Sequence, residues 1–251
     1  MKNETNKTYR SFLKDDIRLE TDFSRSDQNL GKVAPPIEKP CPIDANKIDL
    51  PSPDSWKTVS EISVREAIAQ RASRRKYSSQ SVTLEELSFL LWATQGVRKR
   101  TAGAALRTVP SAGCRHAFET YLAVFNVEGL PKGIYRYLPL THQLVHESTP
   151  EHLEEKMTAA ALGQTFAGSA AVTFIWTVIP YRMEWRYAEA SYKVLALDAG
   201  HVCQNLYLAC ESIGAGTCAI AAYDQKKSDQ LLGIDGDDEF VIYMSPVGKD
   251  K

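Results

Sequence analysis

The sequence predicts one domain that contains both helices and strands, preceded by an extended N-terminal arm. The chain has 251 residues, of which 43% are hydrophobic, so it can build the core of one large domain or two small ones. Two helix-capping signatures and several short apolar runs bounded by turn residues indicate helices and strands together. No internal repeat or low-complexity tract divides the chain further.

Residues 1–60 are polar, charged and rich in proline. Prolines stand at positions 35, 36, 40, 42, 51 and 53. Because proline fixes φ and has no amide hydrogen, prolines at this density favour extended backbone and exclude helix. We expect this segment to be an arm that wraps a surface or a partner subunit, and the domain to span residues 61–251.

Two capping boxes predict the first helices of the domain. Ser63-x-x-Glu66 opens a helix over residues 64–71, and Thr83-x-x-Glu86 opens a second one over residues 84–94. In such a box the hydroxyl accepts a hydrogen bond from the third helical amide, while the glutamate accepts one from the amide of the cap residue. Both helices therefore have defined starts.

Apolar runs predict the strands that follow. Residues 121–127 and 172–179 are expected to form buried strands. Between them, residues 133–146 are expected to form a hairpin around Pro139-Leu-Thr-His142, followed by a helix over residues 151–162.

The most regular pattern predicts a long helix over residues 182–213. Spacings of three and four residues separate the members of its apolar stripe, which are Leu195, Ala199, Val202, Leu206, Ala209 and Ile213. At 1.5 Å per residue this helix would be roughly 45 Å long, more than a small domain needs to cover its own core, so we expect a partner chain to share it. Gly214-Ala-Gly216 would end the helix, with strands over residues 217–223 and 239–245.

Composition excludes several classes of function. A formal net charge of −1 gives no general attraction to nucleic acid or to an anionic membrane, and the longest apolar run is too short to cross a bilayer. The five cysteines contain no C-x-x-C pair and the five histidines have no metal-ligand spacing, so we expect neither a disulfide framework nor a metal site. No apolar leader follows Met1, and we expect a cytoplasmic protein.

A cluster of positive charge stands between the first two predicted helices. Residues 71–76 hold four cations in six positions. A phosphate group requires fixed cationic donors, and the planar guanidinium of arginine matches two of its oxygens at once. The alternative interpretation is a solvated basic turn after a helix.

Two further segments consist mainly of small residues. Pro110-Ser-Ala-Gly113 would let the backbone approach a flat ligand, with Ser111 supplying a hydroxyl, although an ordinary turn explains it too. Gly214-Ala-Gly-Thr-Cys-Ala-Ile220 lacks the G-x-G-x-x-G pattern and does not follow a strand, which disfavours a Rossmann nucleotide site. No Walker, H-E-x-x-H or G-x-S-x-G motif is present.

In this order and spacing, the three segments resemble the FMN-binding landmarks of the nitroreductase superfamily, together with Gly248-Lys249 near the C-terminus. Residues 106–116, 133–137 and 198–206 are more similar to its SagB-type branch. The resemblance covers residues 63–249. It implies an α+β fold in which helices flank a central, mostly antiparallel sheet, and an intertwined homodimer with two FMN sites at its interface.

The resemblance also implies roles for individual residues. Arg71, Ser73 and Arg75 would hold the FMN phosphate, ribityl chain and pyrimidine edge, and Lys249 would add a further cation for the phosphate. Donors at the N1–O2 edge of a flavin stabilise its anionic reduced form. Hydride would enter from NAD(P)H or another donor and leave to a small organic substrate by a ping-pong route.

The segments of small residues take the remaining cofactor roles in this resemblance. Pro110, Ser111, Ala112 and Gly113 form the segment that would reach the flavin from the partner subunit. In the segment that begins at Gly214, the backbone groups of Gly216 and Thr217 would approach the isoalloxazine.

One pair of residues departs from the SagB-type pattern. Azoline oxidases of that branch carry a Lys-Tyr pair for proton abstraction near the start of the long helix, and the matching residues here are Arg186 and Tyr187. Arginine stays protonated and cannot act as a general base at ordinary pH. Tyr187 could still serve as an acid or hydrogen-bond donor, and Arg186 could clamp an anionic substrate or simply lie on the helix surface.

Three functional hypotheses follow. The first is an FMN-dependent reductase or dehydrogenase that acts on a small organic substrate. The second is a thiazoline or oxazoline dehydrogenase subunit of a peptide-modifying complex, with a cyclodehydratase as its partner. The third is a flavin-binding protein without turnover.

Overall fold

The computed structural model describes residues 2–101 and 103–250. Its α-helices are α1 (Lys2–Ser11), α2 (Ile17–Glu20), α3 (Val64–Gln70), α4 (Leu84–Gln95), α5 (Leu153–Ala160), α6 (Tyr181–Tyr187), α7 (Tyr192–Glu211) and α8 (Gln225–Leu232). Its strands are β1 (Lys47–Asp49), β2 (Val97–Thr101), β3 (Ala104–Arg107), β4 (Phe118–Val124), β5 (Gly133–Leu138), β6 (Gln143–Ser148), β7 (Val172–Val178), β8 (Ala215–Thr217) and β9 (Phe240–Lys249). Short 3-10 helices are η1 (Phe23–Arg25), η2 (Pro53–Ser55), η3 (Ala112–Cys114), η4 (Thr165–Ala167) and η5 (Ala188–Ser191).

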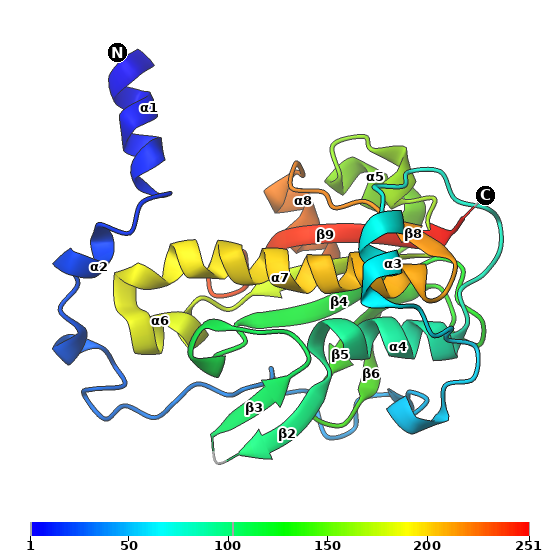
Figure 1. The fold of residues 1–251 in the computed structure, drawn as a ribbon, viewed down its shortest axis with the longest axis horizontal. Helices are drawn as coiled ribbons and strands as arrows, with labels where there is room; N and C mark the ends of the chain where they lie inside the picture. The colour runs from blue at the N-terminus through cyan, green and yellow to red at the C-terminus, as the bar shows by residue number, and fades with distance from the viewer. Residues whose placement is uncertain (1, 102, 251) are drawn as a thin grey trace.

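A seven-stranded sheet forms the centre of the domain, in the order β1-β6-β5-β4-β7-β9-β8. Every neighbouring pair of these strands is antiparallel. Helices flank the sheet, with α7 lying along it and α4 beside α7 (Figure 1). The predicted α+β fold with a mostly antiparallel sheet is confirmed.

Alternation along the strands gives the sheet two apolar faces. On β4, Leu122 and Val124 belong to the core that α4 and α7 cover, whereas Tyr121 and Ala123 belong to a second core with α5 and α8. Helices on both sides explain why β4 and β7 are buried along their whole length.

Most of the predicted elements are present. Both capping boxes form, and they open α3 and α4 where the sequence places them. The buried strands correspond to β4 and β7, the hairpin to β5 and β6, and the helix after it to α5. The last predicted strand is β9, which continues to Lys249.

The prediction of one continuous helix over residues 182–213 is wrong. The helix is interrupted where Ala188 adopts φ 45° and ψ −134°, so that α6 and the short η5 precede α7. The apolar stripe begins only at Leu195. Upstream of it, no apolar pattern with helical spacing supports a continuation of the same helix. The strand expected over residues 217–223 is wrong too, because β8 ends at Thr217 and only Ile220 bridges to β9.

The expectation of extended backbone without helix over residues 1–60 is wrong for the first residues, and the proline-rich part also contains the 3-10 helix η2. Helices α1 and α2 precede the first proline, where nothing prevents helix. The arm then runs along the domain and adds β1 to the sheet edge beside β6. In Figure 1 it begins with α1, which stands out from the domain, and passes close to α6.

Several elements were not predicted, among them a hairpin and a helix inside the domain. The charged segment at Arg98-Lys-Arg100 belongs to the hairpin of β2 and β3, which turns at Gly103 with φ 79°. Helix α8 is capped by Asp224, whose side chain accepts a hydrogen bond from the Lys227 amide.

Candidate functional site

The cationic segment leaves α3 at Arg71 and runs along the β8 edge of the sheet. Ser73 forms a parallel bridge with Thr217, and the amide of Arg74 donates to the Thr217 carbonyl at 3.0 Å. The capped helix α3 fixes where this segment begins, and the backbone bridge fixes its course. The structure therefore brings Arg71, Ser73 and Thr217 together.

A tyrosine that the sequence reasoning missed stands at the centre of this cluster. The guanidinium carbon of Arg71 lies 5.3 Å from the centre of the Tyr207 ring, and the Ser73 hydroxyl is 3.0 Å from the Tyr207 hydroxyl. The backbone amide of Ala219 donates to the same hydroxyl at 2.9 Å. Tyr207 follows Leu206 of the apolar stripe and lies four residues before Glu211, on one face of α7 with it. We call Arg71, Ser73, Tyr207 and Thr217 the Tyr207 cluster.

The cations of the segment differ in how they are neutralised. Arg74 pairs with Glu211 at 2.6 Å and with Asp250 at 3.3 Å. The hydrogen bond to Glu211 raises the pKa of Arg74 further. Within residues 2–101 and 103–250, neither Arg71 nor Arg75 has an ion-pair partner. Arg71 therefore gives the cluster an uncompensated positive charge, whereas Arg75 lies outside it, with its guanidinium carbon 5.8 Å from the centre of the Phe166 ring.

Gly214, Gly216 and Lys249 are also predicted cofactor-binding residues near the cluster, and their exposure and contacts differ from one another. Gly216 is buried, and a Cβ atom placed there would lie 2.5 Å from Cδ of Arg74, so the arginine stem covers this glycine. Gly214 is exposed, with φ 58°. Lys249 is buried, with its ammonium on Glu86 and on the Ile213 carbonyl, both at 2.5 Å. Because its charge is already paired inside the domain, we leave Lys249 out of the phosphate site.

The second predicted segment, Pro110 to Gly113, precedes and enters η3. Ser111 Oγ accepts a hydrogen bond from the His116 amide at 3.0 Å, and the amide of Ala112 donates to Asp198 on α7 at 3.1 Å. Burial raises the pKa of Asp198, while its hydrogen bonds to Ser111 and Ala112 oppose that shift. Asp198 therefore fixes this segment to α7, with Pro110 exposed beside it.

Gly113 lies directly against the two candidate catalytic residues. Its φ is 56°, and a Cβ atom placed there would come within 2.5 Å of the Tyr187 hydroxyl and 3.0 Å of the Arg186 side chain. Only glycine meets both the conformation and the space. The chain thus brings Gly113, Arg186 and Tyr187 together.

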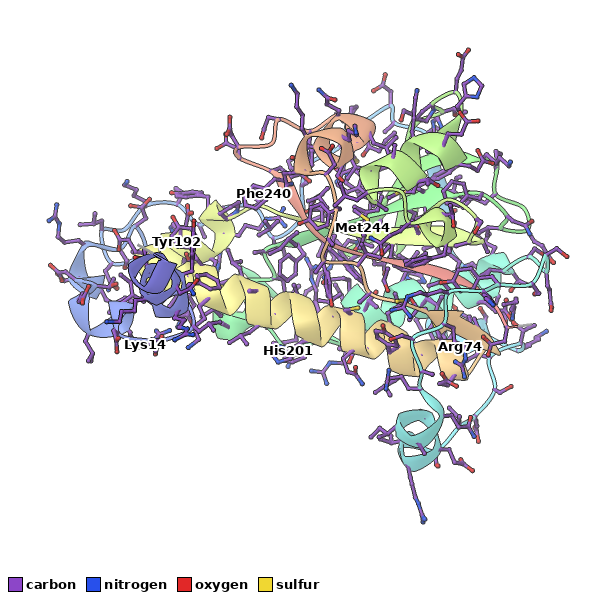
Figure 2. The ribbon with its side chains drawn as sticks, turned by 90° about the horizontal axis from the view of Figure 1, so that it is seen from above. Lys14, Arg74, Tyr192, His201, Phe240 and Met244 are labelled. Atoms are coloured by element: carbon purple, nitrogen blue, oxygen red, sulfur yellow. The ribbon has the colours of Figure 1, made fainter. Side chains whose placement is uncertain are left out.

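The two groups of predicted residues lie at opposite ends of α7. The helix has 20 residues and is therefore about 30 Å long. Figure 2 shows Tyr192 at one end, close to α6, and Arg74 beside the other end. A single chain does not bring Gly113, Arg186 and Tyr187 near the Tyr207 cluster.

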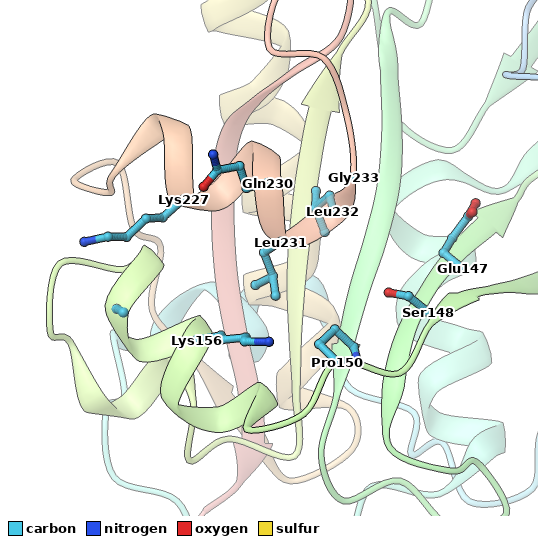
Figure 3. A pocket seen from close by; sticks show the side chains of 10 residues that line it. Glu147, Ser148, Pro150, Lys156, Lys227, Gln230, Leu231, Leu232 and Gly233 are labelled. Carbon is cyan, nitrogen blue, oxygen red and sulfur yellow. The ribbon is translucent and has the colours of Figure 1, made fainter.

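A cavity of about 780 Å³ lies elsewhere, between α5, α8 and the end of β6. Figure 3 shows Lys156, Lys227 and Leu231 on one side of it, and Glu147 and Ser148 on the other. None of its lining residues is a predicted site residue, so its size alone assigns it no role.

In the part of the chain that the structure describes, no group of three or more His, Cys, Asp or Glu residues could hold a metal ion. No helix there is long and apolar enough to cross a membrane.

Comparison with known proteins decides the family. The profile of the Nitroreductase family matches residues 68–249. The chain belongs to the nitroreductase family. It is 32% identical over 206 residues to MJ1384 of Methanocaldococcus jannaschii, a protein named as a nitroreductase, and the match covers 82% of this chain and 98% of that protein. This nitroreductase-family chain is therefore an oxidoreductase.

A second relative is the trifolitoxin-processing protein TfxB of Rhizobium leguminosarum bv. trifolii. It is 28% identical over 156 residues, which is 59% of this chain and 41% of TfxB. The chain thus matches less than half of that protein.

Solved structures show the same fold. A protein of Ralstonia eutropha JMP134 named as a nitroreductase superposes with a TM-score of 0.68 at 26% identity, covering 87% of this chain and 97% of that one. A chain of the Escherichia coli microcin synthetase McbBCD complex gives 0.61 at 18% identity, with coverages of 94% and 91%. The NADPH:FMN oxidoreductase of Vibrio harveyi gives 0.52 at 17% identity, with coverages of 74% and 68%. The last two show the fold alone.

Proposed function

We propose that this nitroreductase-family protein is an FMN-dependent oxidoreductase that transfers a hydride between NAD(P)H, or another donor, and a small organic substrate. The observation that carries the proposal is the Tyr207 cluster, where Arg71, which has no acidic partner among the described residues, lies beside a serine and a tyrosine hydroxyl at the sheet edge. Its family membership and the fold it shares with an NADPH:FMN oxidoreductase support the choice of FMN.

The residues of the cluster fit a phosphorylated cofactor. The uncompensated guanidinium of Arg71 would bind the phosphate, because charge-assisted and bidentate hydrogen bonds to phosphate are strong. Arg75 is the second cation that the sequence predicts for this role, and it lies outside the cluster. Hydroxyls of Ser73 and Tyr207 can donate or accept, as the hydroxyls of a ribityl chain require. When bound, the flavin supplies the hydride chemistry, and the protein supplies position and electrostatic field.

The proposal includes a homodimer, because neither end of α7 is a complete site. Paired about a two-fold axis, two α7 helices can run in opposite directions, so that the Gly113 end of one chain meets the Tyr207 cluster of its partner. Exposed apolar side chains support such pairing. Val64 and Ile68 of α3 are 71% and 58% exposed, and Leu197 of α7 is 55% exposed. Large exposed apolar side chains that gather on one region often mark an interface.

In this arrangement the residues on α6 would face the substrate. Tyr187 has a hydroxyl that can donate a proton or a hydrogen bond to the substrate. Arg186 stays charged and can orient an anionic group, but it cannot abstract a proton. Gly113 leaves room for both side chains.

The proposed phosphate site is tested by an Arg71→Ala substitution. A hydrogen bond to a charged group contributes about 1.5–3 kcal/mol, so the Kd for FMN should rise about 10- to 100-fold. Quenching of flavin fluorescence on titration into the apoprotein measures this change. The matched control is Arg65→Ala, which removes an exposed arginine from the same helix and should leave the Kd unchanged. Wild-type protein that fails to bind FMN, or to bleach anaerobically with NADH or NADPH, would refute the proposal.

A second candidate function is azoline oxidation within a peptide-modifying complex. The resemblance to TfxB and to a chain of the McbBCD complex favours it, as does the position of Tyr187 against Gly113. Arg186 opposes it, because an arginine cannot serve as the base. Arg186→Lys should then create thiazoline-peptide oxidation that the wild-type protein lacks, measured as the loss of two mass units. If neither form oxidises the peptide, this candidate is removed.

A further inference from the structure

The N-terminal arm is bound to α6, the helix that carries Arg186 and Tyr187. The amide of Gln28 donates to the Trp185 carbonyl at 2.8 Å, and the indole N–H of Trp185 donates to the Lys32 carbonyl at 3.0 Å. The Tyr181 hydroxyl donates to Asp27 at 2.7 Å. These contacts place the arm over α6.

A second set of contacts holds the arm where it leaves α6. The guanidinium of Arg107 donates to the Ile37 carbonyl at 2.8 Å, and that of Arg136 donates to the Lys39 carbonyl at 2.8 Å. The amide of Lys39 in turn donates to the buried Glu119 at 2.7 Å. Both donors and the acceptor are buried side chains of the domain. The arm is therefore held at α6 itself and again where it continues toward β1.

A cavity of about 300 Å³ lies between the arm and α6. Arg18, Phe23, Ser26 and Gln28 line it from the arm, and Arg186 and Tyr187 line it from α6. Arg18 is already paired with Asp15 at 2.9 Å, so it is less available to a ligand than Arg186. The candidate catalytic residues are thus not open to solvent on all sides. The arm closes one wall of the space that they face.

Positive charge prevails beside this cavity. Arg186 has no ion-pair partner among the residues described, and its guanidinium carbon lies 5.5 Å from the centre of the Tyr187 ring. Nearby Arg115 stacks on Trp185 at 4.6 Å, and its buried Nη2 lacks a hydrogen-bond partner in residues 2–101 and 103–250. The pKa of Arg115 is lowered, chiefly by burial and next by the charge of Arg186. An anion at Arg186 would relieve this repulsion.

We propose that the arm and α6 form the substrate site, and that this site takes an organic molecule carrying a carboxylate. Arg186 binds the carboxylate through its planar guanidinium. The Gln28 side chain supplies an amide, Ser26 supplies a hydroxyl, and the Phe23 ring packs on the apolar body of the ligand. A cavity of this volume admits a single substituted ring.

The arm then determines substrate specificity. Its cavity residues lie outside residues 68–249, which match the family profile, so the part of the chain shared with the family does not supply this wall. The inference deepens the proposed function and rests on it, since Gly113, against Arg186 and Tyr187, belongs to the segment expected to close over the partner's flavin.

Benzoate and benzamide test the site, because they share the ring and have similar shapes, but only benzoate presents a charged, acceptor-only group to Arg186. Isothermal titration of each into the flavin-loaded protein should give benzoate a Kd at least 10-fold lower than benzamide. Arg186→Gln should abolish this preference, because benzoate should lose much more affinity than benzamide. Phe23→Ala should weaken both ligands by the same factor and keep the preference.

Arg25→Gln is the matched control. Arg25 lies on η1 beside Phe23 but is exposed and does not line the cavity, so this variant should retain the wild-type preference. Equal binding of the two ligands, absence of binding, or a preference that survives Arg186→Gln would overturn the inference. Flavin content, measured by absorbance on every sample, separates the two proposals. Protein with FMN but without a benzoate preference contradicts the substrate site alone, whereas protein that cannot bind FMN contradicts the proposed function.

Discussion

At the scale of single residues, a cation is available to bind a ligand only when no acidic side chain of the protein already pairs with it. Arg71 and Lys249 are both cations of the expected phosphate site, yet only Arg71 lacks an acidic partner among the described residues. Glu86 also belongs to the capping box of α4, so it fixes the start of that helix and binds Lys249 at 2.5 Å. A cation paired at this distance inside the domain is poorly placed to bind a ligand.

His116 gives a prediction for the pH dependence of stability. Burial, and then the charges of Arg107 and Arg115, lower its pKa from 6.5 to about 3. Between these values the unfolded chain binds a proton that the folded chain does not. The free energy of unfolding should therefore fall as the pH falls from 6.5 to 3, by about 1.4 kcal/mol per pH unit from this group alone.

Urea unfolding at pH 7, 6 and 5 measures this contribution. His116→Gln should flatten the dependence, because its side chain does not titrate. His201→Gln, at an exposed position of α7, is the control and should follow the wild-type slope. Parallel slopes for the wild-type protein and His116→Gln would show that the buried imidazole is not the cause.

At the scale of elements, the sequence predicts those whose signals are local. The capping boxes predict the starts of α3 and α4, and the apolar runs predict β4 and β7, since these signals depend on neighbouring residues only. The break at Ala188 could not be predicted. An alanine favours helix, and its positive φ exists only because the packing of α6 and α7 imposes it.

The candidate site divides in the same way. Arg71, Ser73 and Thr217 could be predicted to lie together because their segments resemble a known family pattern. Tyr207 could not, since its part in the site depends on the register between α7 and the β8 edge. The arm residues at the α6 cavity were beyond prediction too, because no local pattern indicates which surface an arm covers.

Glu119 on β4 joins three elements, and its removal gives the second prediction. Its carboxylate binds Arg182 of α6 at 2.5 Å, lies 3.7 Å from Arg136 of β5, and accepts from the amide of Lys39 in the arm. All the charged partners are buried. Glu119→Gln would leave buried cations without this counter-charge and should lower the free energy of unfolding by about 3–5 kcal/mol.

Equilibrium unfolding in urea measures the loss for Glu119→Gln. Glu147→Gln removes a carboxylate that also binds Arg136, at 2.7 Å, but whose side chain is 31% exposed. As the matched control it should cost much less. Limited proteolysis should also cut the arm of Glu119→Gln faster than that of the control. Equal stability of the two variants would mean that Glu119 does not hold these elements together.

At the scale of the whole molecule, helix α7 separates the two groups of candidate site residues. The Tyr207 cluster lies at one end of this helix, and Gly113, Arg186 and Tyr187 lie at the other. The sheet has helices on both faces, so its own core is complete within one chain. What remains open is the outer side of α7 and the neighbouring α3, with Leu197 and Ile68 exposed. The proposed two-fold pairing would cover this region and complete both sites at once.

Gly200 provides the test of that pairing. It lies in the interior of α7, where glycine costs about 1 kcal/mol relative to alanine, and a Cβ atom built on it would have no neighbour within 4 Å among the described residues of the same chain outside its own helix backbone. Packing within the described part of one chain therefore does not explain the glycine, whereas close approach of a second α7 in the proposed dimer would. Gly200→Trp should convert the dimer to a monomer and reduce FMN retention. Light scattering coupled to size exclusion measures the mass, and Glu155→Trp, at an exposed position of α5 on the other face of the sheet, should remain dimeric. If Gly200→Trp has the mass of the wild-type dimer, α7 does not form the interface, and the two ends of this helix belong to separate sites.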